Sequence, residues 1–355
     1  MKKYIFGGVG FVLMVLMLWL LFRKTDWHEV QKAVAASNKL LLFASLIPLF
    51  LAHPARVRRW SFIVRAAYPA TFWQMFSATQ IGFLANAVLP ARAGEAIRPL
   101  VLTRLTGLPF SKSMALNAVD RLTDLFGLLA VMAVSLLAFQ PAGDLSIPAA
   151  TFGTDEPIIF TAGQYRQGAF ATGAVLLVIV AGFVGLYTNR NVVLWISTKV
   201  FGLISKRVAD YINGMINHFA DGLHVFRSPI ELARSVWWSF ITWGMNLAGL
   251  AIALMAFDVE FPWYTPFVMQ AILAVAIAAP NTPGFVGPFH IAIVLALVMT
   301  VPDVNVDTAK AYAIVAHLSQ FPAVLAFGFW CLMRDNMNLF QLQREGEQQA
   351  KKVAS

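Results

Sequence analysis

The chain has 355 residues, of which 59% are hydrophobic and only 13% are charged, and its mean hydropathy is +0.67. Soluble domains carry about 25% charged residues, so this composition excludes an ordinary soluble protein and indicates an integral membrane protein. The net charge of +9 does not indicate nucleic-acid binding, because no soluble basic domain exists to carry it. Basic residues gathered in cytoplasmic loops explain it. The single cysteine, Cys331, excludes an internal disulfide, and we expect no metal or cofactor.

The first 70 residues predict two membrane spans that begin and end in the cytoplasm. Residues 4–22 are an apolar run between lysines and arginines, long enough to cross about 30 Å of hydrocarbon. Residues 25–39 form a short polar connector on the external side. A second span begins at residues 40–52 and ends at basic residues that we place in the cytoplasm, namely Arg56, Arg58, Arg59 and Arg65.

The remaining apolar runs predict an all-α polytopic membrane protein in which residues 1–334 form one transmembrane domain. It has about six full spans plus two broken helical hairpins. The later spans are expected at 112–139, 168–187, 235–257 and 311–333, and 140–167 forms the longest external loop. Residues 189–234 are basic and amphipathic, which predicts cytoplasmic helices lying on the membrane surface. Residues 335–355 have the composition of a disordered cytoplasmic tail, so both termini are expected in the cytoplasm.

Two segments share an unusual design, in which a short apolar helix is followed by a break rich in proline and then by a second short helix. They are residues 71–104, with Pro90 at the break, and residues 265–301, with the break P-N-T-P-G. The first is entered from the cytoplasm and the second from outside, which predicts an inverted repeat with a binding site between its halves. The exposed N–H groups of the half-helices would suit an anionic headgroup. The alternative is two ordinary spans that proline merely kinks.

Charged residues cluster around the first break. Arg92, Glu95 and Arg98 are spaced three apart and would neighbour one another on a helix, as would Asn117, Asp120 or Arg121, and Asp124. An arginine offers a planar fork that matches phosphate, and nearby acids can hold that fork in place. We therefore predict that Arg92 and Arg98 bind a lipid phosphate. The alternative is a structural network that neutralises itself and joins helices.

His290 follows Pro288 in the first turn of the second half-helix, where it could meet the same substrate or carry a proton. An interhelical hydrogen bond is the alternative for His290, as for His317 and Gln320. The predicted substrate-binding set is Asn86, Arg92, Glu95, Arg98, Arg121, Asp124, Asn281 and His290.

The motifs N-A-V-L-P-A-R-A-G-E-A-I-R-P (86–99), D-R-L-T-D (120–124) and P-N-T-P-G-F-V-G (280–287) resemble the lysylphosphatidylglycerol synthase transmembrane region, a flippase-like family. The resemblance covers roughly residues 3–334. It implies a multi-span inner-membrane protein that moves or handles anionic, aminoacylated or polyprenyl-linked lipids. In bifunctional relatives a C-terminal cytoplasmic domain makes the aminoacyl lipid. This chain ends soon after its last span, so we expect a stand-alone translocator rather than a synthase.

Other readings of the sequence remain open. The chain could be a membrane partner of a glycosyltransferase or of a lipid-synthesis enzyme, and a homodimer is compatible with either role. It could also be a lipid-linked glycosyltransferase with Asp26 and Glu29 as its acids, although the loop that carries them is very short.

Overall fold

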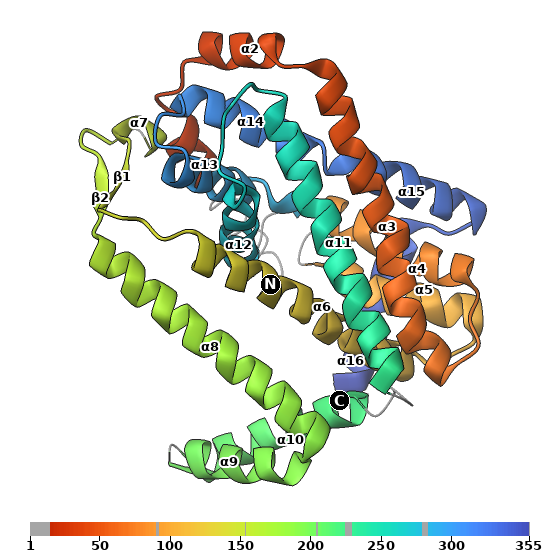
Figure 1. Cartoon of the computed structure of the whole chain (residues 1–355). Helices are drawn as coiled ribbons and strands as arrows, with labels where there is room; N and C mark the ends of the chain where they lie inside the picture. Colours follow the sequence, from red (N-terminus) through yellow and green to blue (C-terminus); the bar gives the residue numbers. More distant parts are fainter. Residues whose placement is uncertain are drawn as a thin grey trace.

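The computed structural model describes residues 15–89, 92–152, 154–203, 205–223, 229–278 and 283–354, and helices dominate this part (Figure 1). Five helical segments among these residues are long and apolar enough to cross a membrane: Lys39–Ala67, Phe110–Ala138, Ala162–Gly182, Ile230–Met255 and Val306–Arg334. The predicted fold class, an all-α polytopic membrane protein, is confirmed. The first expected span, 4–22, lies partly outside the described residues, and 15–22 are helical.

The second span extends further than we predicted. Helix α3 (Lys39–Ala67) continues through Pro48, Pro54 and the arginines that we had placed in a cytoplasmic loop. It continues because Arg59 is only 2% exposed and pairs with carboxylates of another helix, so it does not need water. The connector before it is not irregular either, since it contains α2 (Trp27–Ala36), which Asp26 caps.

Both proline-containing segments form helical hairpins. In the first, α4 (Phe72–Val88) packs against α5 (Gly94–Thr106), which begins three residues later than the expected start at Ala91. In the second, α12 (Thr265–Ala278) packs against α13 (Pro288–Thr300), with the short 3-10 turn η1 (Pro283–Phe285) between them. Each hairpin belongs to its own hydrophobic core. The inverted relation of the two hairpins stays a prediction.

The helix α6 (Phe110–Ala138) connects the first hairpin to an irregular region. There, β1 (Leu145–Ile147) pairs antiparallel with β2 (Ile158–Phe160), and α7 (Ala149–Phe152) lies between them. The chain then runs through α8 (Ala162–Thr188) to α9 (Arg190–Gly202) and α10 (Lys206–Leu223), which lie at one end of the molecule (Figure 1). Helix α11 (Pro229–Met255) returns along α3.

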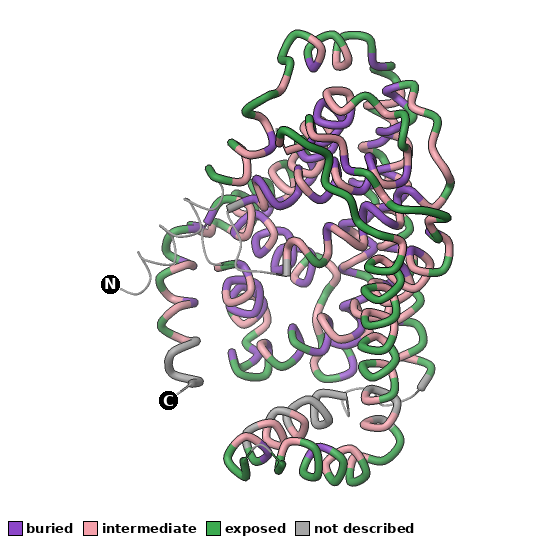
Figure 2. Tube along the Cα trace, turned by 90° about the vertical axis from the view of Figure 1, so that its left-hand side faces the viewer, coloured by how far each residue is buried: buried purple, intermediate pink, exposed green. Residues whose placement is uncertain are grey.

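The last span consists of α14 (Val306–Leu318) and α15 (Phe321–Arg334). The expectation of a disordered tail is wrong, because residues after it form α16 (Leu339–Ala354), which packs on α5. Leu339 and Leu342 on this helix are buried, so one apolar face orders a segment whose overall composition is polar. Figure 2 shows the buried residues gathered along the centre of the bundle, whereas α8 and α9 are mostly exposed.

Candidate functional site: a charged cavity between the hairpins

A cavity of about 670 Å³ lies where the two hairpin breaks approach each other. Its walls come from α3, α4, α6, α11, α12 and the α14–α15 span, so it is enclosed by helices far apart in the sequence. The lining is apolar except for a group of side chains that carry charge or hydrogen-bonding atoms: His53, Arg56, Asn86, Arg92, Glu95, Arg121, Asp124, Asn246, Gln270, His317 and Gln320. A cavity of this size, with apolar walls and polar groups that converge on it, is typical of a small-ligand site.

The two breaks touch each other through Arg92. This residue precedes α5 with a φ of 52°, a left-handed conformation that is uncommon outside glycine. Its guanidinium donates a hydrogen bond to the backbone carbonyl of Ile277 in the last turn of α12. On the other side, Gly284 has a φ of 61°, and its carbonyl bonds the His317 ring nitrogen at 2.8 Å. The cavity is therefore bordered by backbone groups of one hairpin and by a cation of the other.

Glu95 is held at the edge of the cavity by three neighbours. Arg121 of α6 donates to its carboxylate at 2.5 and 3.4 Å, and the amides of Asn86 and Asn117 each lie 3.4 Å away. Both members of the ion pair keep more than a third of their side-chain surface exposed. This pair can therefore open without leaving a fully buried charge.

Asn86 also closes the first turn of α5. Its side-chain oxygen accepts the Gly94 N–H at 2.8 Å, and the next two N–H groups bond Arg92 and Ala93 carbonyls. Glu95 adds a negative charge in the same turn. The expectation that this half-helix offers free N–H groups to an anion is therefore wrong, because the chain itself uses them.

Behind the cavity wall, a ladder of alternating charges connects three helices. Arg98 of α5 bonds Asp120 of α6 at 2.8 Å, Asp120 bonds Arg59 of α3 at 2.9 Å, and Arg59 bonds Asp124 one turn further along α6. The Arg98 guanidinium also lies 3.8 Å from the Trp60 ring centre. Arg59, Arg98 and Asp120 are at most 4% exposed, so this network joins helices and does not face the cavity.

Asp124 is where the ladder reaches the cavity. Its carboxylate also accepts hydrogen bonds from Ser239 at 3.2 Å and Trp243 at 3.0 Å, both on α11. Next to it, Arg56 bonds only the amide oxygen of Asn246, at 3.4 Å, and lies over the Phe83 ring. Within the described part of the chain, neither Arg56 nor Arg92 forms an ion pair with a carboxylate. The lining carries three arginines against two carboxylates. Among the described residues, the two arginines without an ion pair come from α3 and from the segment before α5.

The structure separates the predicted site residues into three groups. Those that line the cavity are Asn86, Arg92, Glu95, Arg121 and Asp124. Arg98 is in the buried ladder, and His290 packs against Phe22, Phe289 and His317, where its ring accepts the Gly287 N–H. Asn281 lies outside the described residues.

Sequence reasoning missed Arg56, Arg59 and Asn246. The spacing of His53, Arg56 and Arg59, three apart on one face of a helix, was a usable signal that these residues act together. The competing rule that arginines after an apolar run mark the cytoplasmic end of a span obscured this signal.

A bundle of apolar helices around an internal charged cavity defines a polytopic membrane protein with a polar site at membrane depth. The chain belongs to the lysylphosphatidylglycerol synthase transmembrane region family, whose profile matches residues 7–328. It is similar to the glycosyltransferase AglD of Haloferax volcanii, with 25% identity over 346 residues that cover 93% of this chain and 54% of that protein. The chain thus spans about half the length of this curated relative. No solved structure matches.

Proposed function

We propose that this protein is a lipid translocator that binds an anionic lipid headgroup in the charged cavity and moves it between the leaflets of a bacterial cytoplasmic membrane, with both termini cytoplasmic. The headgroup belongs to a phospholipid, an aminoacyl-phospholipid or a polyprenyl phosphate. The observation that carries the proposal is the pair Arg56 and Arg92, two cations that line the cavity. Neither forms an ion pair with a carboxylate among the described residues, although the nearby Asp124 attracts Arg56. Cations at membrane depth are costly unless an anion visits them.

The contacts of Arg92 indicate how a headgroup would be accommodated. Its present partner is a backbone carbonyl of α12, a neutral acceptor that a phosphate oxygen would outcompete because charge-assisted hydrogen bonds are stronger. Transfer of Arg92 from Ile277 to the phosphate would release the contact between the two breaks. Headgroup binding would then separate the hairpins, as alternating access requires.

The test uses purified protein in liposomes that contain phosphatidylglycerol with a fluorescent headgroup reporter, whose accessibility to a membrane-impermeant quencher is followed over time. We expect protein-dependent movement that falls at least tenfold in Arg56→Gln and Arg92→Gln. The matched control is Arg58→Gln, an exposed arginine on the same helix as Arg56 that does not line the cavity. Equal rates in all three variants would refute the proposal.

A second candidate is a membrane partner of a glycosyltransferase that transports nothing. The similarity to the Haloferax glycosyltransferase favours it. Asp26 and Glu29, the two acids of the glycosyltransferase alternative, have structural roles in the loop that carries them. Asp26 caps α2, and Glu29 pairs with Lys32 on the same helix, at the surface. In the liposome assay a partner protein gives no protein-dependent movement, and only an enzyme changes the mass of the lipid.

A further inference from the structure

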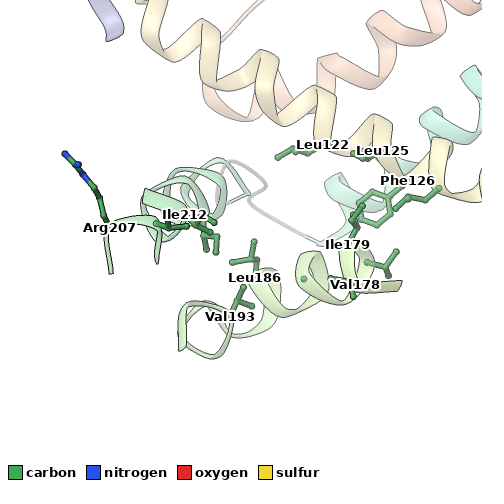
Figure 3. A pocket seen from close by; sticks show the side chains of 14 residues that line it. Leu122, Leu125, Phe126, Val178, Ile179, Leu186, Val193, Arg207 and Ile212 are labelled. Carbon is green, nitrogen blue, oxygen red and sulfur yellow. The ribbon is translucent and has the colours of Figure 1, made fainter. Parts of the chain in front are cut away.

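A second cavity lies on the opposite side of α6 from the charged one. It has a volume of about 940 Å³ and is enclosed by α6, α8, α9 and α10, with its lining side chains shown in Figure 3. Helix α8 diverges from the rest of the bundle in Figure 1, and no residue in the apolar stretch with which it could span the membrane is buried. We call this space the apolar pocket.

The lining of the apolar pocket comes from regular helical stripes. Val208, Ile212 and Ile216 recur every four residues along α10, so they form one face of that helix. On α6, Leu122, Leu125, Phe126 and Leu129 form a similar stripe. Among the described lining residues, Arg207 is the only charged one. The apolar faces of α10 and α6 are regular, yet they line a cavity and do not pack into the core.

The position of the apolar pocket decides which material fills it. Both α6 and α8 are long enough to span the membrane, so the space between them lies at the depth of the lipid chains. Aliphatic walls that face an empty space lose their dispersion contacts, and water finds no partners there. Arg207 lies at one edge of the lining, where its charged end points away from the labelled apolar side chains (Figure 3). A cation at this place favours a negatively charged headgroup.

We propose that the apolar pocket holds a hydrocarbon chain of an anionic membrane phospholipid, whose phosphate is bound by Arg207. This site is separate from the charged cavity, since Leu128 faces the charged cavity whereas Leu125 and Leu129 face the apolar pocket. The proposed lipid site requires only that a lipid stays bound there, so the proposal does not depend on translocation.

Two glycines of α8 supply a matched pair of variants. Gly182 lines the apolar pocket, and Gly173 does not. A Cβ atom added at either position would meet no heavy atom within 4 Å, so both positions accept a larger residue. Gly182→Phe would place a ring in the pocket, whereas Gly173→Phe makes the same change elsewhere on the same helix.

The full chain is reconstituted with phosphatidylglycerol that carries a photoactivatable group in one acyl chain, and labelled peptides are identified by mass spectrometry after illumination. We expect labels at Leu125, Phe126 and Ile179 in the wild type and in Gly173→Phe, and at least a fivefold loss in Gly182→Phe. Arg207→Gln should reduce labelling by phosphatidylglycerol and leave labelling by a phosphatidylcholine probe unchanged.

Undiminished labelling in Gly182→Phe would overturn the proposal, and so would crosslinks from these positions to a second copy of the chain, which would make the pocket a protein interface. Thermal melting of both glycine variants in detergent shows whether they fold like the wild type. Because the labelling needs no transport, its result is independent of the liposome assay of headgroup movement.

Discussion

The first hairpin, α4 and α5, and the second, α12 and α13, both consist of two short helices joined by a break, but their side chains differ in kind. Between residues 72 and 106 the first hairpin carries Arg92, Glu95, Arg98 and Arg104. The second has no Asp, Glu, Lys or Arg from 265 to 301. Its polar contributions to the cavity are the Ile277 carbonyl, the backbone of η1 and the amide of Gln270.

This difference indicates a division of labour between similar backbones. One hairpin supplies charge, and the other supplies neutral acceptors, to which Arg92 would return after release of a headgroup if the protein acts as the proposed translocator. A cavity with arginines on both hairpins would hold an anion tightly and release it slowly, because each cation would have to be separated from the ligand. One cationic side and one neutral side suit a site that must bind and release.

The two hairpins also differ in how much space surrounds a glycine near each break. A Cβ atom added to Gly94 would lie 2.0 Å from the Gly82 carbonyl oxygen, whereas one added to Gly284 would lie 3.3 Å from the end of the Phe321 ring. We expect Gly94→Ala to separate α4 from α5 and to abolish folding or cavity formation, which size-exclusion chromatography of the solubilised protein would detect. Gly284→Ala, strained by its φ of 61°, should still yield folded protein. Equal yields would mean that the hairpins tolerate the change alike.

The next largest effect is expected at Arg98. Removing it leaves Asp120 fully buried with one of its two arginines gone, so we expect Arg98→Ala to lower the free energy of unfolding by about 3 to 5 kcal/mol. Arg58→Ala, at an exposed position, should change it by less than about 0.5 kcal/mol. Thermal melting in detergent would measure both. A wild-type melting temperature for Arg98→Ala would show that the ladder does not stabilise the fold.

The sequence indicated the hairpins because proline and glycine act locally, and both breaks fall where these residues predicted them. It did not separate Arg92 from Arg98. On an ideal helix each of them would neighbour Glu95, but Arg92 lies before α5 with a positive φ, so its side chain reaches α12 while Arg98 turns into the core. A three-residue spacing cannot reveal where the first helical turn begins.

The role of Arg59 was equally hidden, because its partner Asp120 lies 61 residues away on another helix. Local charge rules assign such an arginine to a cytoplasmic loop, and only the tertiary contact keeps it inside α3. The helical structure of α16 had a local signal in the sequence, because Leu339 and Leu342 are spaced for one helical face. The polar composition of the segment led to the expectation of disorder instead.

A smaller effect is expected at the half-exposed pair of the first hairpin. Glu95→Gln removes the carboxylate that competes with an anionic headgroup for Arg121, so binding of phosphatidylglycerol should tighten about fivefold, which corresponds to about 1 kcal/mol. Gln270→Met alters a neutral lining residue of the second hairpin and should leave the preference for phosphatidylglycerol over phosphatidylcholine unchanged. Lipid titration with the purified protein would measure both. Weaker binding in Glu95→Gln would assign the charge selectivity to another part of the cavity.

The smallest effect is expected where α16 packs on the outer side of the first hairpin. Glu345 pairs with Arg104 and bonds Gln341, and these hydrogen bonds lower the pKa of the Glu345 carboxyl from its ordinary value of 4.5. A lowered pKa in the folded state means that the pair contributes stability at neutral pH and loses it as the pH falls below about 4.5. Because both side chains are about a third exposed, Glu345→Gln should cost only about 0.5 kcal/mol at pH 7. The melting difference between variant and wild type should shrink as the pH falls below about 4.5 and the Glu345 carboxylate becomes protonated. A difference that stays constant as the pH is lowered would show that the charge of Glu345 does not attach α16 to the hairpin.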